Sequence, residues 1–272
     1  MISRRTALSM AAAGTAMLAT RRSFAAPLTI SPAGLIFTDI DLGKAKVRAL
    51  VDTGSVRALQ ITSSVANALG IPRSPTGQLT QRYQGAAQPI SQGTLAHASL
   101  IDSNLQDVPV FVAPGDIEAI AAQVGTAFDA ILGWPLLSRL DVIIDYWDAS
   151  IRNARLAGAP LAEWRLVEGR PLPVVAGHFN NAPIDFLIDT GAPWCNISLG
   201  MIADLAVGGR REFDFDLAGH PYRATFRAKD LSAMTRGIGA QAVIGHRFLA
   251  DFRIGWSQNA AALLLYAAAP RR

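Results

Sequence analysis

The triplet Asp-Thr-Gly occurs twice in this chain, beginning at Asp52 and at Asp189. Each copy follows a short apolar run, at 49–51 and 186–188, with the length and composition of a buried strand. Glycine permits a sharp turn after each run, so both aspartates are expected on loops at strand ends. A chain that meets this constraint twice must build two similar strand-and-loop units.

The context of the triplet is repeated as well. Residues 28–157 and 158–270 pass through the same events in the same order: a hairpin turn, a strand, the triplet, a short helix, and an apolar-apolar-glycine motif leading into a second helical stretch. Between these landmarks lie short strand-like runs bounded by turn residues, which favours a mainly β structure. The landmark residues are Gly43, Ser63, Gly70 and Gly133 in the first half, and Asn180, Ser198, Gly208 and Gly245 in the second.

The two halves differ in the middle. Asp52 and Gly133 are 81 residues apart, whereas Asp189 and Gly245 are 56 apart, so the first half is expected to hold an insertion or longer loops. The predicted organisation is an export signal over 1–26, a first lobe over 27–157 and a second lobe over 158–272. The stretch 152–168 is the expected connection between the lobes.

The repeated tetrads resemble the aspartic proteases of the pepsin and retropepsin group. They are Asp52-Thr53-Gly54-Ser55 and Asp189-Thr190-Gly191-Ala192. Each half is about the size of one retropepsin subunit, so the chain is most similar to bacterial retropepsin-like domains, with two fused in one polypeptide. The resemblance implies a bilobal acid-protease fold of two retropepsin-like β-barrel halves, with the active site at their interface, in a monomer with internal pseudo-two-fold symmetry.

The chemistry of peptide hydrolysis agrees with this resemblance. Without a metal or a covalent nucleophile, hydrolysis needs a base to activate water and an acid to protonate the carbonyl oxygen. Two adjacent carboxyl groups that share one proton supply both, because like charges at close range do not both ionise. Asp52 and Asp189 are therefore the predicted catalytic residues of an aspartic endopeptidase that acts on extended peptides and needs no cofactor or metal.

The resemblance also implies a scaffold around the two aspartates. Thr53 and Thr190 would hydrogen-bond across the lobe interface, and Gly54 and Gly191 would allow the tight loop geometry. These residues are expected to be structural rather than reactive.

The residue after each triplet breaks the symmetry. The Ser55 hydroxyl is expected to donate to the carboxylate of Asp52 and favour its ionised form, whereas Ala192 offers Asp189 nothing. This pattern predicts that Asp52 is more often the anion of the pair.

A mobile hairpin is expected to cover the substrate. Its candidate tips are Tyr83-Gln84-Gly85 and the turn at Gly219, each about thirty residues after its aspartate, which suggests two flaps. An ordinary exposed loop tyrosine is an equal alternative for Tyr83.

Charge and hydropathy restrict location and partners. Residues 1–26 combine a basic start, an apolar run and small residues before Pro27, which indicates an export signal to the periplasm or beyond; paired arginines leave the twin-arginine route open. The net charge of +4 comes from four arginines in that segment, leaving 21 basic and 21 acidic residues. Nothing then favours nucleic acid or an anionic membrane, and no run is long enough for a membrane span.

The remaining reactive residue types are weak signals. Cys195 is the single cysteine, which excludes an intrachain disulfide and a cysteine metal cluster, and it is expected to be a small buried hydrophobe. The histidines show no metal-ligand spacing. Asp129, Asp141 and Asp145 are expected to be surface or turn acids.

Two alternatives to a general endopeptidase stay open at this point. One is a non-catalytic envelope binding protein that retains the double fold, because fold alone does not establish function. The other is a processing enzyme with a single partner, which would differ in cleft residues that the sequence does not locate.

Overall fold

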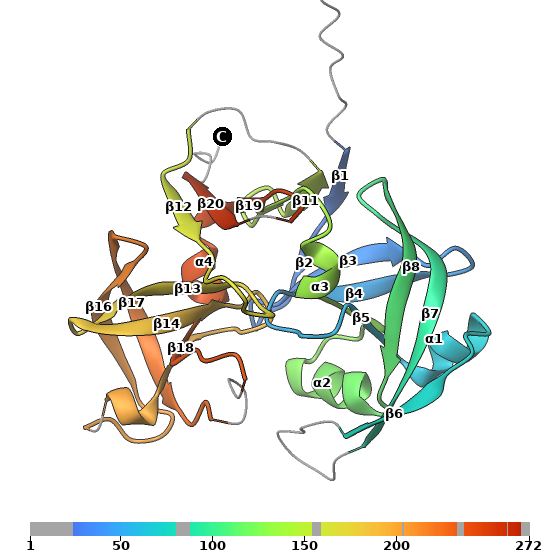
Figure 1. Cartoon of the computed structure of the whole chain (residues 1–272), viewed down its shortest axis with the longest axis horizontal. Coiled ribbons are helices and arrows are strands. Elements are labelled where there is room, and N and C mark those ends of the chain that lie inside the picture. Colours follow the sequence, from blue (N-terminus) through green and yellow to red (C-terminus); the bar gives the residue numbers. More distant parts are fainter. Residues whose placement is uncertain are drawn as a thin grey trace, which may run out of the picture.

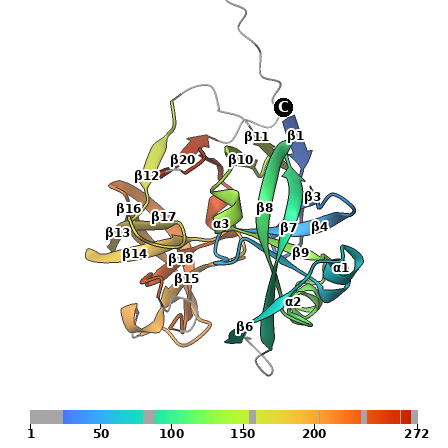
Figure 2. The same ribbon diagram turned by 45° about the vertical axis from the view of Figure 1, so that its right-hand side comes forward.

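The computed structural model describes residues 24–79, 88–153, 159–202, 204–232, 237–259 and 261–267. Within these ranges most regular structure is strand, and the strands form two barrels beside each other and a further sheet that lies above both (Figures 1 and 2). This arrangement confirms the predicted mainly β, bilobal architecture.

The first barrel is a ring of strands closed by a pairing between Asp41 and Ser99. Two further strands lie outside the ring. Strand β2 (Thr29–Ile30) pairs with β3, and β6 (Ser74–Leu79) pairs with β7. In their order around the ring, the strands are β3 (Ile36–Asp41), β4 (Lys46–Asp52), β9 (Ala130–Gly133), β5 (Leu59–Ile61), β8 (Ser103–Val112) and β7 (Pro89–Leu100).

The second barrel repeats this ring strand for strand. The parallel pair β4–β9 has its counterpart in β14–β18, and the parallel pair β5–β8 in β15–β17. The internal repeat inferred from the sequence is therefore a repeat of topology. In ring order, the strands are β13 (Val174–Phe179), β14 (Ala182–Ile188), β18 (Ala242–Ile244), β15 (Cys195–Ser198), β17 (His220–Lys229) and β16 (Arg210–Leu217).

The short helices follow the predicted landmarks with two differences: the cap of the first helix, and the helix predicted after Ser198, where the structure has only a 3₁₀ turn without a side-chain cap. Thr62 rather than Ser63 caps the first helix, because its hydroxyl accepts from the Val65 N–H at 3.4 Å. In the second half the equivalent position holds a single 3₁₀ turn. The helices are α1 (Ser63–Ala68), α2 (Asp116–Val124), α3 (Trp134–Leu137) and α4 (His246–Leu249), with the 3₁₀ turn η1 (Leu199–Met201).

Strand β6 and helix α2 account for the greater length of the first half, since neither has a counterpart among the described residues of the second. Helix α2 covers the outside of the first barrel. Its buried Ile117 packs in a separate apolar cluster with Phe37, Leu50 and Ile131 of the strands and with Leu35 and Phe128, which lie just before strands β3 and β9. The extra residues of the first half thus add a helix, α2, that covers the outer face of the barrel, and a strand, β6, that pairs with β7.

The third sheet joins the two halves. Its central pair, β10 and β19, brings one strand from each half into antiparallel register, and the predicted connection enters it through β11 and β12. Its first strand includes Phe24 to Ala26, the last residues of the predicted signal. The strand order is β1 (Phe24–Pro27), β11 (Ser150–Asn153), β10 (Val142–Asp145), β19 (Phe252–Trp256), β20 (Ala262–Ala267) and β12 (Ala162–Arg165).

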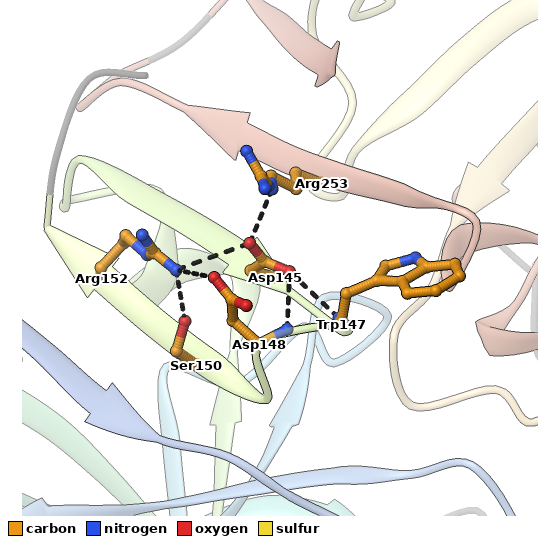
Figure 3. A network of polar contacts seen from close by, with 6 residues as sticks. All are labelled: Asp145, Trp147, Asp148, Ser150, Arg152 and Arg253. Carbon is orange, nitrogen blue, oxygen red and sulfur yellow. Dashed lines mark hydrogen bonds and ion pairs between the residues drawn. The ribbon is translucent and has the colours of Figure 1, made fainter. Parts of the chain in front are cut away.

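Asp145, at the end of β10, is fully buried, so the prediction of a surface acid is wrong for this residue, although it does stand at a turn, as the alternative prediction had it. Its carboxylate accepts from the backbone N–H groups of Trp147 and Asp148, each at 3.0 Å. It also forms ion pairs with Arg253 of β19 at 2.7 Å and Arg152 of β11 at 3.5 Å (Figure 3). These groups replace the water that a buried carboxylate loses, and they tie the two halves together electrostatically.

Candidate active site

The two aspartates stand at the ends of equivalent strands. Asp52 is the last residue of β4 and lies in register with Gly133 of the parallel strand β9. Asp189 directly follows β14, and its N–H donates to the carbonyl of Ile244 at 2.9 Å. Each carboxyl therefore sits on a loop fixed by a central strand of its own barrel.

The loops are joined by a reciprocal set of buried hydrogen bonds. The Thr53 N–H donates to the Thr190 hydroxyl at 3.1 Å, and the Thr190 N–H donates to the Thr53 hydroxyl at 3.0 Å. Each hydroxyl then donates to a carbonyl of the opposite half, Thr53 to Ile188 and Thr190 to Val51, both at 2.7 Å. Both threonines thus have a donor and an acceptor across the interface, and neither hydroxyl is left to react.

The two glycines bring the carboxyl groups together. A Cβ atom added at Gly54 would collide with the carboxyl of Asp189, and one added at Gly191 would collide with the carboxyl of Asp52. Each glycine N–H also donates to the carboxyl of its own loop, at 2.9 Å for Asp52 and 2.8 Å for Asp189. The close approach of two carboxyls therefore depends on glycine at both positions.

The environment makes the paired carboxyls unequal. Burial raises the pKa of Asp52 well above its ordinary value, the charge of Asp189 and a hydrogen bond to it raise it further, and the N–H groups of Gly54 and Ser55 oppose the shift. Burial also raises the pKa of Asp189, but a hydrogen bond from Asp52, the N–H groups of Gly191 and Ala192, and the charge of Lys229 oppose that shift. These directions favour the shared proton on Asp52 and the charge on Asp189, within a pair that titrates as a unit.

This assignment reverses the one predicted from Ser55. The Ser55 hydroxyl contacts the backbone of Arg57, as acceptor from its N–H at 3.4 Å and as donor to its carbonyl at 3.5 Å. The hydrogen bond from Ser55 that lowers the pKa of Asp52 therefore comes from its backbone N–H and not from its hydroxyl. The prediction was wrong because a backbone partner two residues away occupies the hydroxyl.

Residues behind the loops support them; the repeated landmarks Gly133 and Gly245 predicted the two helices that supply most of these residues, whereas no sequence pattern indicated Tyr146. The first N–H of α3, from Trp134, donates to the carbonyl of Ser55 at 3.1 Å, and the first N–H of α4, from His246, donates to Ala192 at 2.7 Å. The ring of Tyr146 packs edge-on against His246 with 5.1 Å between centroids. Burial, and then the charge of Asp189, raises the pKa of Tyr146, so this phenol lies within electrostatic reach of the carboxyl pair.

Of the predicted flap residues, the structure describes Gly219 but neither Tyr83 nor Gly85. Tyr83 and Gly85 lie outside the described residues, between β6 and β7. Gly219 lies in the turn between β16 and β17, and in the matched topology that turn corresponds to Ile101 and Asp102, between β7 and β8. The two candidate tips are therefore not equivalent, because β6 has no counterpart in the described part of the second half.

The other reactive groups add no second chemistry to the site. Cys195 is buried and free, and burial raises the pKa of its thiol to about 12, so it is a packed thiol as predicted. No group of three or more potential metal-ligating side chains gathers within the described ranges. In the same ranges, no helix is long and apolar enough to cross a membrane.

Two six-stranded barrels with paired carboxyl loops between them define the class of this structure as a bilobal, retropepsin-like fold. Residues 38–136 match the model of a family described as aspartyl protease. The matched segment includes Asp52 and most of the first barrel, whereas Asp189 lies outside it. No curated protein matches the chain.

Proposed function

We propose that this protein is an aspartic endopeptidase that hydrolyses peptide bonds with a water molecule activated by Asp52 and Asp189. The observation that carries the proposal is the position of each carboxyl against the glycine of the opposite loop. The family match of residues 38–136 supports a protease-type function independently. Fixed carboxyls with one shared proton supply an acid and a base at one place.

The unequal carboxyls suggest the role of each in the reaction. Asp189 accepts a proton from water as the water oxygen bonds to the peptide carbonyl carbon, while Asp52 donates its proton to the carbonyl oxygen. In the second half of the reaction, Asp189 passes its proton to the leaving nitrogen as the C–N bond breaks, and Asp52 takes a hydroxyl proton of the intermediate as the carbonyl re-forms. The acid and base are regenerated, and the net change is the addition of one water across the peptide bond.

The threonine bonds support this chemistry by holding the geometry. Four hydrogen bonds of 2.7 to 3.1 Å fix the two loops relative to each other before substrate arrives. A pre-organised site does not have to order its catalytic groups during the reaction, which lowers the barrier. An extended peptide between the two barrels is the proposed substrate.

The test is cleavage of a denatured protein from acid to neutral pH by the wild type and by Asp52→Asn and Asp189→Asn. Each substitution should lower kcat by about 10²- to 10⁴-fold, because each removes an acid or base. An inhibitor of aspartic proteases should abolish wild-type cleavage. The matched control is Asp39→Asn, since Asp39 is an exposed partner of Lys46 and aligns on β3 with Arg48, four residues before Asp52 on β4.

The alternatives predict different outcomes of that experiment. A non-catalytic binding protein cleaves nothing at any pH, and a processing enzyme for one partner leaves a denatured general substrate intact but cleaves that partner. Normal cleavage by either Asn variant would reject the dyad mechanism.

We also propose that residues 1–26 direct export and are removed, leaving lobes over 27–157 and 158–272 that work as a monomer. Strand β1 starts at Phe24 and pairs with β11, so this cleavage would leave one residue of that strand. N-terminal sequencing of the exported protein tests the boundary. A mature protein that keeps residues 1–26 would contradict the proposal.

A further inference from the structure

A cavity of about 470 Å³ lies on the second barrel, beside the loop that continues from Asp189. It is lined by Trp194 and Cys195 at the end of that loop, by residues of β16 and β17, and by α4. Trp194 follows Asp189 by five residues. Since a chain extends at most about 3.6 Å per residue, their Cα atoms are within about 18 Å of each other.

The cavity is marked by two arginines on one aromatic ring. The guanidinium carbon of Arg210 lies 3.9 Å from the centroid of the Trp194 ring, and that of Arg247 lies 3.4 Å from it. Stacking uses the face of a guanidinium group and leaves the N–H groups at its edge free for an acceptor. The tryptophan therefore holds two cationic groups at the cavity in a defined orientation.

These two charges are not neutralised within the described residues. Neither Arg210 nor Arg247 forms an ion pair or donates a hydrogen bond to a side chain or carbonyl there. Arg223, which also lines the cavity, is already engaged by Asp214 through contacts of 2.6 and 3.0 Å. Asp251 is the acid among the lining residues, so one carboxylate faces two unpaired guanidinium groups.

The first barrel lacks this feature at the equivalent position. The fifth residue after Asp52 is Arg57, whose guanidinium donates to the Gln60 side chain at 3.3 Å. Gln60 in turn donates to the carboxylate of Asp116 in α2 at 2.8 Å, and the charge of Asp116 acts on Arg57. The positive charge of Arg57 thus has a nearby carboxylate in its own barrel, whereas Arg210 and Arg247 form no ion pair among the described residues.

We propose that Trp194, Arg210 and Arg247 form a subsite for a carboxylate of the peptide substrate, on one side of the scissile bond. This inference rests on the proposed function and names a substrate class for it. A planar carboxylate accepts two parallel N–H bonds from a guanidinium group, which favours it over a neutral amide of the same shape. Because an extended peptide rises about 3.3 Å per residue, the acidic residue lies within about five residues of the bond that is cut.

The test compares peptides that differ by one glutamate-to-glutamine exchange at each position within five residues of the cleaved bond. With amidated C-termini, the wild type should show a kcat/KM about ten-fold higher for glutamate at a position on one side. A parallel set with a free C-terminus determines whether a terminal carboxylate binds in place of a side chain. The preference should weaken with added salt, since the arginines are exposed.

The variants Arg210→Gln and Arg247→Gln should each reduce the ratio of kcat/KM for the glutamate peptide to kcat/KM for the glutamine peptide, and together they should bring that ratio to one. The control is Arg165→Gln, an arginine with 86% of its side chain exposed on β12, which should leave the preference unchanged. Equal cleavage of both peptides at every position, or a preference that survives the double variant, would overturn the inference.

Binding of the same peptides to Asp52→Asn protein separates this inference from the proposed function. If no peptide is cleaved by the wild type but glutamate peptides bind more tightly than glutamine peptides, the protease proposal fails and the subsite stands. If peptides are cleaved and no glutamate preference exists in either assay, the subsite fails alone. The absence of both cleavage and preference would reject both.

Discussion

The two barrels are alike where the backbone holds the carboxyl pair and differ in the side chains around it. Their rings match strand for strand, and the threonine bonds between them are reciprocal to within 0.1 Å. In contrast, the charge of Lys229 acts on Asp189, and no lysine or arginine is among the causes that shift the pKa of Asp52. Symmetry is thus kept for positioning, while the electrostatics give the two carboxyls different protonation states.

The same comparison extends outward from the pair. In the first half, α2 supplies the acid that balances Arg57 through Gln60 and also covers the outer face of the barrel. The second half has no such helix among its described residues, and its arginines at Trp194 are left unpaired. An insertion in one half therefore makes the two sides of the site chemically different toward a substrate.

The largest expected effect concerns the sheet that joins the halves. Asp145→Asn should lower the free energy of unfolding by about 3–5 kcal/mol, because it removes a fully buried carboxylate: the largely covered Arg253 loses its ion-pair partner, and Arg152 keeps only its pair with Asp148. Urea unfolding of the variant measures this loss. The exposed pair of Asp39 with Lys46 provides the control, and Asp39→Asn should cost less than about 1 kcal/mol. A loss below that value for Asp145→Asn would mean that the halves do not depend on this network.

A smaller, matched effect tests the symmetry of the loops. Thr53→Val and Thr190→Val should each cost about 2–3 kcal/mol, because each leaves a buried N–H and a buried carbonyl in the opposite half without a partner. The two losses should be equal within the error of urea unfolding. Thr94→Val, at an exposed position of β7, is the control and should change little. Clearly unequal losses would show that one half holds the other in place.

The repeat, the strand-end position of both aspartates and the two-barrel fold could all be predicted, because they depend on local patterns: apolar runs, turn residues and glycines. The burial of Asp145 could not, since it depends on the register that pairs β10 with Arg253 of β19, which are more than a hundred residues apart. The protonation order was mispredicted for a related reason. Ser55 is adjacent to the Asp52 loop in sequence, but the charge that acts on Asp189 comes from Lys229, forty residues further along the chain.

The smallest expected effect tests the difference between the carboxyls themselves. Both have a raised pKa, so between the ordinary aspartate pKa and the pH at which the dyad loses its proton, the native state binds more protons than the unfolded state. The stability of the wild type therefore falls as the pH rises through that range. Asp52→Asn replaces the protonated carboxyl by a neutral amide and leaves only the buried Asp189 with a raised pKa, so its stability should fall less over this range. Its advantage over the wild type in urea unfolding should grow from acid to neutral pH.

Asp189→Asn provides the matched comparison, because it leaves Asp52 as the remaining carboxyl. The anion would then occupy the position whose pKa is raised well above its ordinary value, and Lys229 would act on an uncharged asparagine. The gain at neutral pH should therefore be smaller than for Asp52→Asn, and more of the pH dependence should persist. A larger gain for Asp189→Asn would assign the shared proton to Asp189. Equal gains would mean that the barrels are electrostatically as symmetric as their strands.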